Sequence, residues 1–227
     1  MVFFKKRTGR AAIFDLDGTL LDTLPSIVTS CNETLDHLKL PPFDKDVIKP
    51  FLGLGPRVLI ERIMAASKVV DPSTIDEAHR LYRELALKQR DYGALPFEGI
   101  REMLDQVAGM GLKLGVMTNK SDKLALSVIA GSFPAGLFEL VRGARRFVPL
   151  KPDPRSTLGM LRSLGAEPSA SYFIGDSDVD VLTGRAAGMH TIAVTWGYRP
   201  RGELEALSPD CLAESPAEIV NCIGGHR

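Results

Sequence analysis

One stretch near the start of the chain decides the fold: Ala11-Ala12-Ile13-Phe14-Asp15-Leu16-Asp17-Gly18-Thr19-Leu20-Leu21-Asp22. Its first four residues are apolar and predict a buried strand, after which Asp15 and Asp17 follow with one residue between them. If the backbone stays extended there, both carboxylates lie on the same side of the chain. An isolated pattern of this kind is equally typical of a strand that runs into an Asp-Gly turn.

Three further apolar runs have the same form, and each also ends on a polar residue. Amphipathic helical patterns lie between the runs, which predicts an α/β fold with a parallel, Rossmann-like sheet. In such sheets ligands bind outside the carboxyl ends of the strands, so the polar residues there are candidates for a functional site. The runs are 112–117, followed by Thr118; 172–174, followed by Gly175 and Asp176; and 191–194, followed by Thr195.

Residues 23–92 interrupt this alternation, because their apolar spacing is helical and no strand pattern lies between the helices. The sequence therefore predicts a small helical cap inserted after the first strand: an α/β core of residues 1–22 and 94–227, and a cap of residues 23–93. Residues suited to fixed turns or hinges flank the insertion. They are Thr23, Leu24 and Pro25 on one side and Gly93, Pro96 and Gly99 on the other.

The composition is that of an ordinary globular chain, with 227 residues, 44% hydrophobic and 25% charged. Its 28 Lys and Arg balance 28 Asp and Glu, so no overall field attracts a nucleic acid or an anionic membrane. Neither a secretion signal nor an apolar run of membrane-spanning length is expected. Cys31, Cys211 and Cys222 lack metal-ligand spacing, which predicts neither a disulfide framework nor a zinc site and favours a cytoplasmic location.

A second acidic segment follows the strand predicted at 172–174. In Gly175-Asp176-Ser177-Asp178-Val179-Asp180, three carboxylates lie within five residues. A solvated acidic loop is the simplest explanation, but carboxylates crowded at a buried strand end raise each other's pKa unless a cation lies among them. A hard, oxygen-rich cluster of this kind suits Mg²⁺.

Two shorter segments allow both a structural and a chemical interpretation. Thr118-Asn119-Lys120 follows a predicted strand, where Thr118 could simply cap the helix that starts near Asp122. Lys151-Pro152-Asp153-Pro154 is compatible with a solvated lysine ahead of a helix. Neither segment identifies a site by itself.

In this order, the segments that contain Asp15, Thr118, Lys151 and Asp176 resemble the signature motifs of the haloacid dehalogenase superfamily of phosphatases. The resemblance covers nearly the whole chain, and the helical insertion resembles the small cap of that superfamily. Two further runs resemble its phosphoglycolate phosphatase branch. They are Thr195-Trp196-Gly197-Tyr198-Arg199 and Ser215-Pro216-Ala217-Glu218-Ile219.

The resemblance implies a role for each motif. Asp15 would attack phosphorus and form an aspartyl-phosphate. Asp17 would protonate the leaving group and later deprotonate water. The Thr118 hydroxyl and the Asn119 backbone amide would bind the phosphoryl oxygens, while Lys151 would supply positive charge.

The resemblance also implies a bound Mg²⁺, without which a carboxylate would repel the phosphate that it attacks. A carboxylate oxygen of Asp15, the backbone carbonyl of Asp17 and the carboxylate of Asp176 would hold the ion. Asp180 would order the water ligands, and Gly18 would let the backbone approach the phosphate closely.

Two cationic features concern the substrate. Arg145 and Arg146 stand where close relatives of phosphoglycolate phosphatases carry an acidic pair, and they form either a solvated basic loop or part of an anion site. The cap loop Gly53-Leu54-Gly55-Pro56-Arg57 resembles the loop that selects the substrate in this family, so Arg57 is the expected specificity residue. An exposed arginine in a first helical turn is the alternative.

Together these inferences predict a Mg²⁺-dependent phosphomonoester hydrolase that acts on a small phosphorylated metabolite, with 2-phosphoglycolate as the expected substrate. We expect a monomer or homodimer, with no nucleic-acid or membrane partner. A phosphosugar mutase of the same superfamily is the nearest alternative, because it uses the same aspartyl-phosphate. A phospho-accepting signalling module is disfavoured, since it needs neither an acid and base at Asp17 nor a helical lid.

Overall fold

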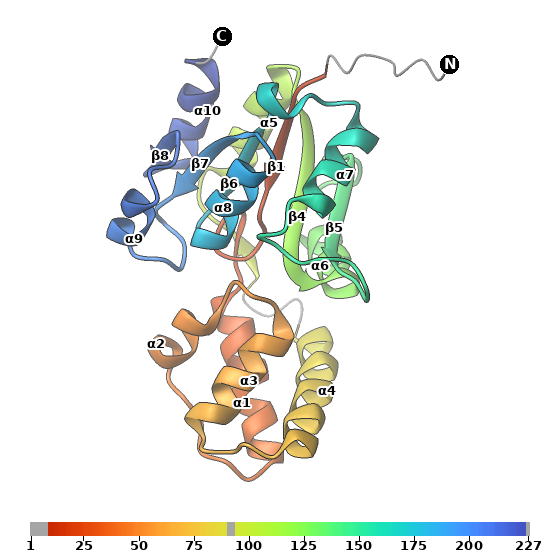
Figure 1. The fold of residues 1–227 in the computed structure, drawn as a ribbon, viewed down its shortest axis with the longest axis vertical. Helices are drawn as coiled ribbons and strands as arrows, with labels where there is room; N and C mark the ends of the chain where they lie inside the picture. The colour runs from red at the N-terminus through yellow and green to blue at the C-terminus, as the bar shows by residue number, and fades with distance from the viewer. Residues whose placement is uncertain (1–8, 90–93, 226–227) are drawn as a thin grey trace.

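The computed structural model describes residues 9–89 and 94–225. Its core is a six-stranded sheet in the order β5, β4, β1, β6, β7, β8, and each neighbouring pair of strands is parallel (Figure 1). The predicted α/β fold with a parallel sheet is therefore confirmed. The strands are β1 (Ala11–Phe14), β4 (Lys113–Ser121), β5 (Leu140–Ala144), β6 (Tyr172–Gly175), β7 (His190–Val194) and β8 (Cys211–Ala213).

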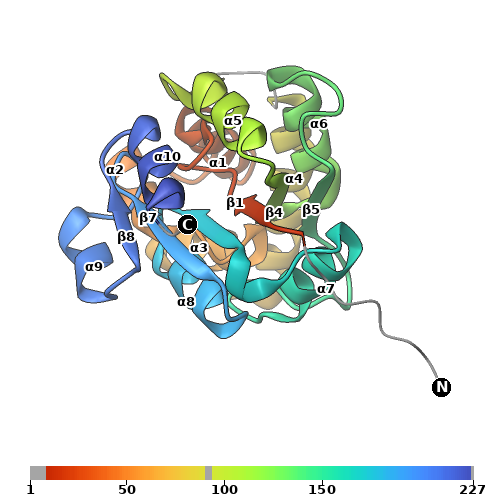
Figure 2. The same cartoon turned by 90° about the horizontal axis from the view of Figure 1, so that it is seen from above.

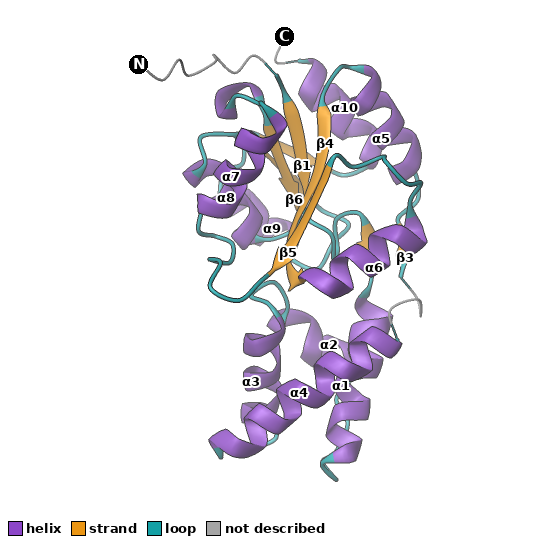
Figure 3. Ribbon diagram, turned by 90° about the vertical axis from the view of Figure 1, so that its right-hand side faces the viewer, coloured by secondary structure: helices purple, strands orange, loops and turns teal. Residues whose placement is uncertain are grey.

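Helices cover both faces of the sheet and make a three-layer core, as Figures 2 and 3 show from two sides. The central strand β1 is fully buried, and its alternate side chains face opposite layers. Phe14 packs in the apolar cluster that contains Ile100, and Ile13 in the one that contains Leu161. The layers contain α5 (Ile100–Gly109), α6 (Asp122–Ser132) and α10 (Pro216–Gly224) on one face, and α7 (Arg155–Leu164) and α8 (Asp178–Ala186) on the other. The short α9 (Arg201–Ala206) follows β7.

The predicted helical insertion lies at the carboxyl end of the sheet, below it in Figures 1 and 3. A short antiparallel ladder joins it to the core, because β2 (Leu21–Asp22) pairs with β3 (Leu95–Pro96). Apolar side chains of the insertion and of the core belong to one buried cluster. Its helices are α1 (Leu24–His37), α2 (Lys45–Ile48), the 3₁₀ helix η1 (Lys49–Phe51), α3 (Pro56–Ala66) and α4 (Pro72–Lys88). Gly93 and the boundary predicted there lie outside the described residues.

Two details differ from the sequence analysis. Thr118 does not follow its strand, because β4 continues to Ser121 with an irregular register after Met117. The expectation that the cysteines form no disulfide is wrong: Cys211 at β8 is bonded to Cys222 of α10, with Cα atoms 6.3 Å apart. Within the described residues, every helix is too short or too polar to cross a lipid bilayer.

Candidate active site

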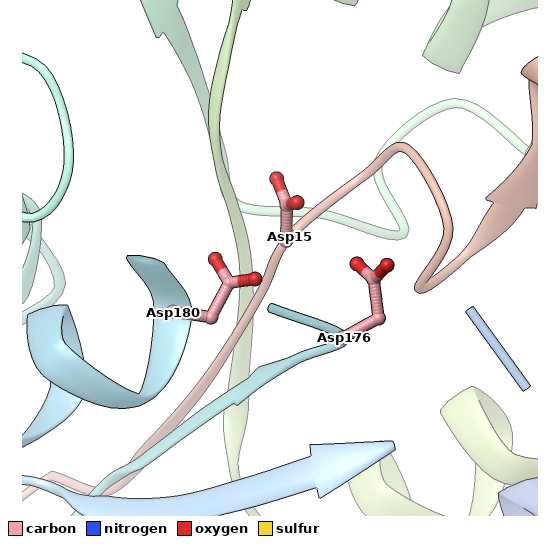
Figure 4. A group of neighbouring side chains, drawn as sticks. All are labelled: Asp15, Asp176 and Asp180. Carbon is pink, nitrogen blue, oxygen red and sulfur yellow. The ribbon is translucent and has the colours of Figure 1, made fainter. Parts of the chain in front are cut away.

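Three carboxylates surround one space at the carboxyl ends of β1 and β6 (Figure 4). Asp15 directly follows β1, Asp176 directly follows β6, and Asp180 lies in the first turn of α8. One oxygen from each carboxylate lies within 4.8 Å of the others. The residues are only 9%, 2% and 1% exposed. Because β1 and β6 are neighbours in the sheet, segments 160 residues apart in the chain meet here.

Local geometry brings Asp180 into this cluster. The Ser177 backbone N–H and hydroxyl both donate to Asp180 Oδ2, at 3.1 and 2.5 Å, and this capping box fixes the start of α8. Gly175 makes the approach possible, since a Cβ there would lie 2.3 Å from the Asp180 Cβ. The family resemblance implied that Asp180 only orders water molecules, whereas its carboxylate lies beside those of Asp15 and Asp176.

Asp176 is held by the segment around Gly18 and by the segment after β7. Its Oδ1 accepts a hydrogen bond from the Thr19 hydroxyl at 3.0 Å, and its Oδ2 accepts one from the Tyr198 N–H at 2.8 Å. Gly18 has a φ of 84°, and a Cβ there would lie 2.5 Å from Asp176 Oδ2. Glycine is therefore required by the turn and by Asp176. Its contact with phosphate remains a prediction.

Lys151 is the cation at the centre of the cluster. Its Nζ lies 2.8 Å from Asp15 Oδ1 and donates to Asp180 Oδ1 at 2.6 Å, and its side chain is 3% exposed. This structural position excludes the solvated lysine that the sequence left open. One ammonium group faces three carboxylates, so with all groups ionised the buried cluster has an excess of negative charge.

The pKa values of the carboxyl groups reflect their burial first and this excess of negative charge second. Burial raises the pKa of Asp15 to about 6, an effect that Lys151 opposes and Asp180 reinforces. Burial also raises the pKa of Asp176 to about 8, and the charges of Asp180 and Asp15 add to the increase. Burial would lower the pKa of Lys151, but the carboxylates of Asp15 and Asp180 raise it.

The cluster has the donor set of a hard divalent cation. All three side chains offer oxygen atoms, which Mg²⁺ prefers. Asp15 Oδ1 is buried and, among the described residues, accepts no well-directed hydrogen bond despite the nearby ammonium. A cation with two positive charges would relieve the mutual repulsion, so Asp15, Asp176 and Asp180 fit a magnesium ion. A metal contact from the backbone carbonyl of Asp17 remains a prediction.

The carboxylate of Asp17 lies in a separate network. Its Oδ1 accepts hydrogen bonds from Lys120 Nζ at 2.7 Å and from the Thr23 hydroxyl at 2.6 Å. Thr23 in turn is bonded to the Tyr198 hydroxyl, whose oxygen lies 3.0 Å from the Thr23 nitrogen. Lys120 is nearly buried, with 8% of its side chain exposed. No role for Lys120 or Tyr198 was predicted from the sequence. The signal for Lys120 is its position directly after Thr118-Asn119.

Asn119 links three parts of the molecule. Its side-chain amide donates to the Gly53 carbonyl in the insertion at 2.9 Å and to the Lys151 carbonyl at 3.0 Å. Its side-chain carbonyl accepts a hydrogen bond from the Lys151 N–H at 2.9 Å. Thr118 beside it is 4% exposed, and its Oγ1 accepts from the Lys120 N–H at 3.2 Å. These hydrogen bonds all join protein groups, so the phosphate contacts of Thr118 and Asn119 remain a prediction.

A cavity between the insertion and the sheet connects these groups. Asp15, Asp17 and Asp176 form its polar end. The opposite wall comes from the insertion and is largely apolar. It includes Ile27 of α1, Leu52, Leu59 of α3, and Tyr82 and Ala86 of α4.

The predicted specificity residue Arg57 lies outside this cavity. Its guanidinium group is paired with Glu61 at 2.6 Å and with Asp76, and 45% of its side chain is exposed. The alternative of an exposed arginine in the first turn of a helix therefore describes its position, because α3 turns this residue toward α4 and solvent. Arg145 pairs with Asp122 at 3.0 Å, and Arg146 covers the ring of Phe147; neither lines the cavity.

A family model described as haloacid dehalogenase-like hydrolase matches residues 12–194. The chain belongs to the haloacid dehalogenase-like hydrolases. Phosphoglycolate phosphatase from Aquifex aeolicus is 30% identical over 217 residues, which cover 96% of this chain and 98% of the relative. The enzyme of that name from Rhodospirillum rubrum is 35% identical over 206 residues, or 88% and 86% of the two chains.

Solved structures agree with this assignment. The crystal structure of CbbY from Rhodobacter sphaeroides in complex with phosphate has a TM-score of 0.80 at 25% identity, and the match covers 93% of this chain and 96% of that chain. The predicted membership in the haloacid dehalogenase superfamily is confirmed, and this chain is an enzyme of the phosphatase type within it.

Replacement of Asn119 in this hydrolase tests its linking role. Asn119→Ala removes three hydrogen bonds, two of them buried, and should lower the free energy of unfolding by roughly 2 to 3 kcal/mol. It should also lower kcat for p-nitrophenyl phosphate, because Lys151 loses its support. The control is Asn32→Ala, which removes two hydrogen bonds to Phe43 within the insertion and should reduce stability only. Equal effects of both variants on kcat would contradict the role of Asn119.

The raised pKa of Asp176 predicts how the metal-free hydrolase responds to pH. The folded carboxyl group titrates near pH 8 and the unfolded one near pH 3.9, so its stabilising contribution is fully present below about pH 4 and is lost as the pH rises to 8. Urea unfolding in EDTA should therefore show Asp176→Asn gaining stability relative to wild type between pH 4.5 and 8, by at least about 1.4 kcal/mol.

The half-exposed Asp178 supplies the control for that measurement. Asp178→Asn should follow the wild-type pH profile. If the free energy of unfolding of Asp176→Asn and of the wild type changed with pH in parallel, Asp176 would not be protonated in the folded metal-free chain.

Proposed function

We propose that this chain hydrolyses 2-phosphoglycolate with Mg²⁺, through an aspartyl-phosphate on Asp15. The observation that carries the proposal is the buried Asp15 carboxylate, 2.8 Å from Lys151 Nζ and grouped with Asp176 and Asp180, at the polar end of a cavity under a helical lid. The names of the Aquifex and Rhodospirillum relatives support the choice of substrate, and the phosphate in the Rhodobacter structure supports the ligand class.

The first step transfers the phosphoryl group to the enzyme. A carboxylate oxygen of Asp15 attacks phosphorus while the bond from phosphorus to the glycolate oxygen breaks. Asp17 donates a proton to the departing alkoxide, so glycolate leaves as the neutral alcohol at that oxygen. The Thr118 hydroxyl and the Lys151 ammonium stabilise the charge on the equatorial phosphoryl oxygens.

The second step restores the enzyme. Asp17, now ionised, takes a proton from a water molecule that attacks phosphorus, and the bond from phosphorus to Asp15 breaks to release inorganic phosphate. Asp15, Asp176 and Asp180 would hold Mg²⁺, which supplies positive charge against the repulsion between carboxylate and phosphate. Residues 23–93 act as the lid over a core of residues 1–22 and 94–227, and closure excludes bulk water.

The enclosed site also limits the class of substrate. The cavity lies between the insertion and the sheet, with Asn119 and the loop at Gly53 bonded across it. A small ester fits such a site, whereas phosphoproteins and nucleic acids would need the lid displaced. They should therefore be poor substrates.

Trapping the intermediate tests the proposal. Acid quenching during turnover of 2-phosphoglycolate, followed by borohydride reduction and peptide mass analysis, should place the phosphoryl group on Asp15. Asp15→Asn should lower kcat by about 10³-fold or more, and Asp17→Asn by roughly 10² to 10⁴-fold. The exposed Asp178→Asn on α8 is the matched control and should retain activity. A label on another residue, or substantial turnover by Asp15→Asn, would exclude this mechanism.

Metal dependence gives an independent test. Activity should vanish in EDTA, return with Mg²⁺ and be inhibited by Ca²⁺, because Ca²⁺ accepts more oxygen ligands and can engage both oxygens of Asp15, leaving neither free to attack. Undiminished hydrolysis after exhaustive chelation would remove the metal from the mechanism.

A further inference from the structure

Among the described residues, four cations lie in or beside the cavity, and three of them are already engaged. Lys151 contacts Asp15 and Asp180, and Lys120 is bonded to Asp17. Arg199 donates to the Leu52 carbonyl at 2.7 Å and lies 3.4 Å from Asp178. The fourth cation is Arg83, which lines the cavity from α4.

Arg83 has no acidic partner in the part of the chain that the structure describes. No described carboxylate lies within 4.0 Å of its guanidinium group. The acidic side chains around it are bonded to other arginines. Glu84 pairs with Arg80 at 3.0 Å, and Glu61 and Asp76 pair with Arg57. Arg83 is thus the cation of the cavity that is available to an incoming anion.

Arg83 lies on α4, on the side of the cavity where the leaving group of the substrate would lie. Tyr82, the preceding residue, is 6% exposed, and Ala86 one turn later is 7% exposed; both form the cavity wall with Arg83. The polar end with Asp15 belongs to the sheet, so a phosphoryl group placed there directs the rest of the ester toward the insertion. Arg83 itself is exposed on this wall, so its guanidinium group is accessible to an incoming anion.

We propose that Arg83 is the specificity-determining residue, and that it binds a carboxylate on the leaving group of the substrate. A guanidinium group offers two parallel N–H donors to the two oxygens of a carboxylate, a match that an uncharged group cannot supply. The inference rests on the proposed phosphatase reaction, and 2-phosphoglycolate is the smallest ester that meets it. Arg83 replaces Arg57 in this role.

The test measures preference between esters that differ in one charge. The pairs are 2-phosphoglycolate with ethyl phosphate, and 3-phosphoglycerate with glycerol 3-phosphate. Arg83→Gln should lower kcat/KM for the carboxylated member about tenfold or more, chiefly through KM, and change the uncharged member less than about threefold. Arg83→Lys, which keeps the charge without the planar donor pair, should fall between wild type and Arg83→Gln.

Two arginines of the insertion provide matched controls. Arg80→Gln lies on the same helix and Arg57→Gln on α3, and both side chains are paired with acidic residues outside the cavity. Both variants should keep the wild-type preference. Equal losses on both members of a pair in Arg83→Gln, or a larger change of preference in Arg57→Gln, would overturn the proposal.

A binding measurement separates this inference from the proposed function. In an Asp15→Asn background with Mg²⁺, calorimetry should show that Arg83→Gln weakens the binding of 2-phosphoglycolate about tenfold or more and leaves that of ethyl phosphate unchanged. If the wild type does not hydrolyse 2-phosphoglycolate but this difference in binding is present, the proposed function fails and the role of Arg83 stands. If hydrolysis occurs and the difference is absent, the role of Arg83 fails alone.

Discussion

The burial of three carboxylates against one ammonium group is the constraint on which the rest of the structure depends. Lys151 approaches both Asp15 and Asp180, but burial raises the pKa of Asp15 and Asp176, and the remaining negative charge adds to the increase. The sheet order brings two of these carboxylates together, because β1 and β6 are adjacent and an aspartate directly follows each strand. The carboxylates of this site repel one another, and a divalent cation would reduce that repulsion. The positive charge of the cation would also favour phosphoryl transfer.

Hydrogen bonds connect the insertion to the backbone of Lys151. The Asn119 amide group bonds to the Lys151 backbone and to the Gly53 carbonyl of the insertion, and Arg199 bonds to the neighbouring Leu52 carbonyl. These two core side chains hold one loop of the insertion over the cavity. Any opening motion that admits substrate must therefore break bonds that also position the site, which couples closure to the arrangement of the reacting groups.

The sequence predicted those parts of the site that follow from strand ends. Asp15 and Asp176 follow buried apolar runs, and the parallel sheet brings them together. Arg83 could not be assigned in the same way, because the direction of its side chain depends on how the insertion packs on the core. Lys120 lies in the part of β4 where the register shifts after Met117, and the sequence pattern does not show this shift. The two-residue strands β2 and β3 are too short to leave a pattern, and the eleven-residue separation of the bonded cysteines does not show that β8 lies beside α10.

A calorimetric titration with Mg²⁺ tests most directly whether the three buried carboxylates bind a divalent cation. The metal-free wild type is compared with Asp176→Asn, and Asp178→Asn is the control. We expect one saturable Mg²⁺ site per chain in the wild type and in the control, and loss of that site in Asp176→Asn. Absence of saturable binding to the wild type, or undiminished binding to Asp176→Asn, would contradict this expectation.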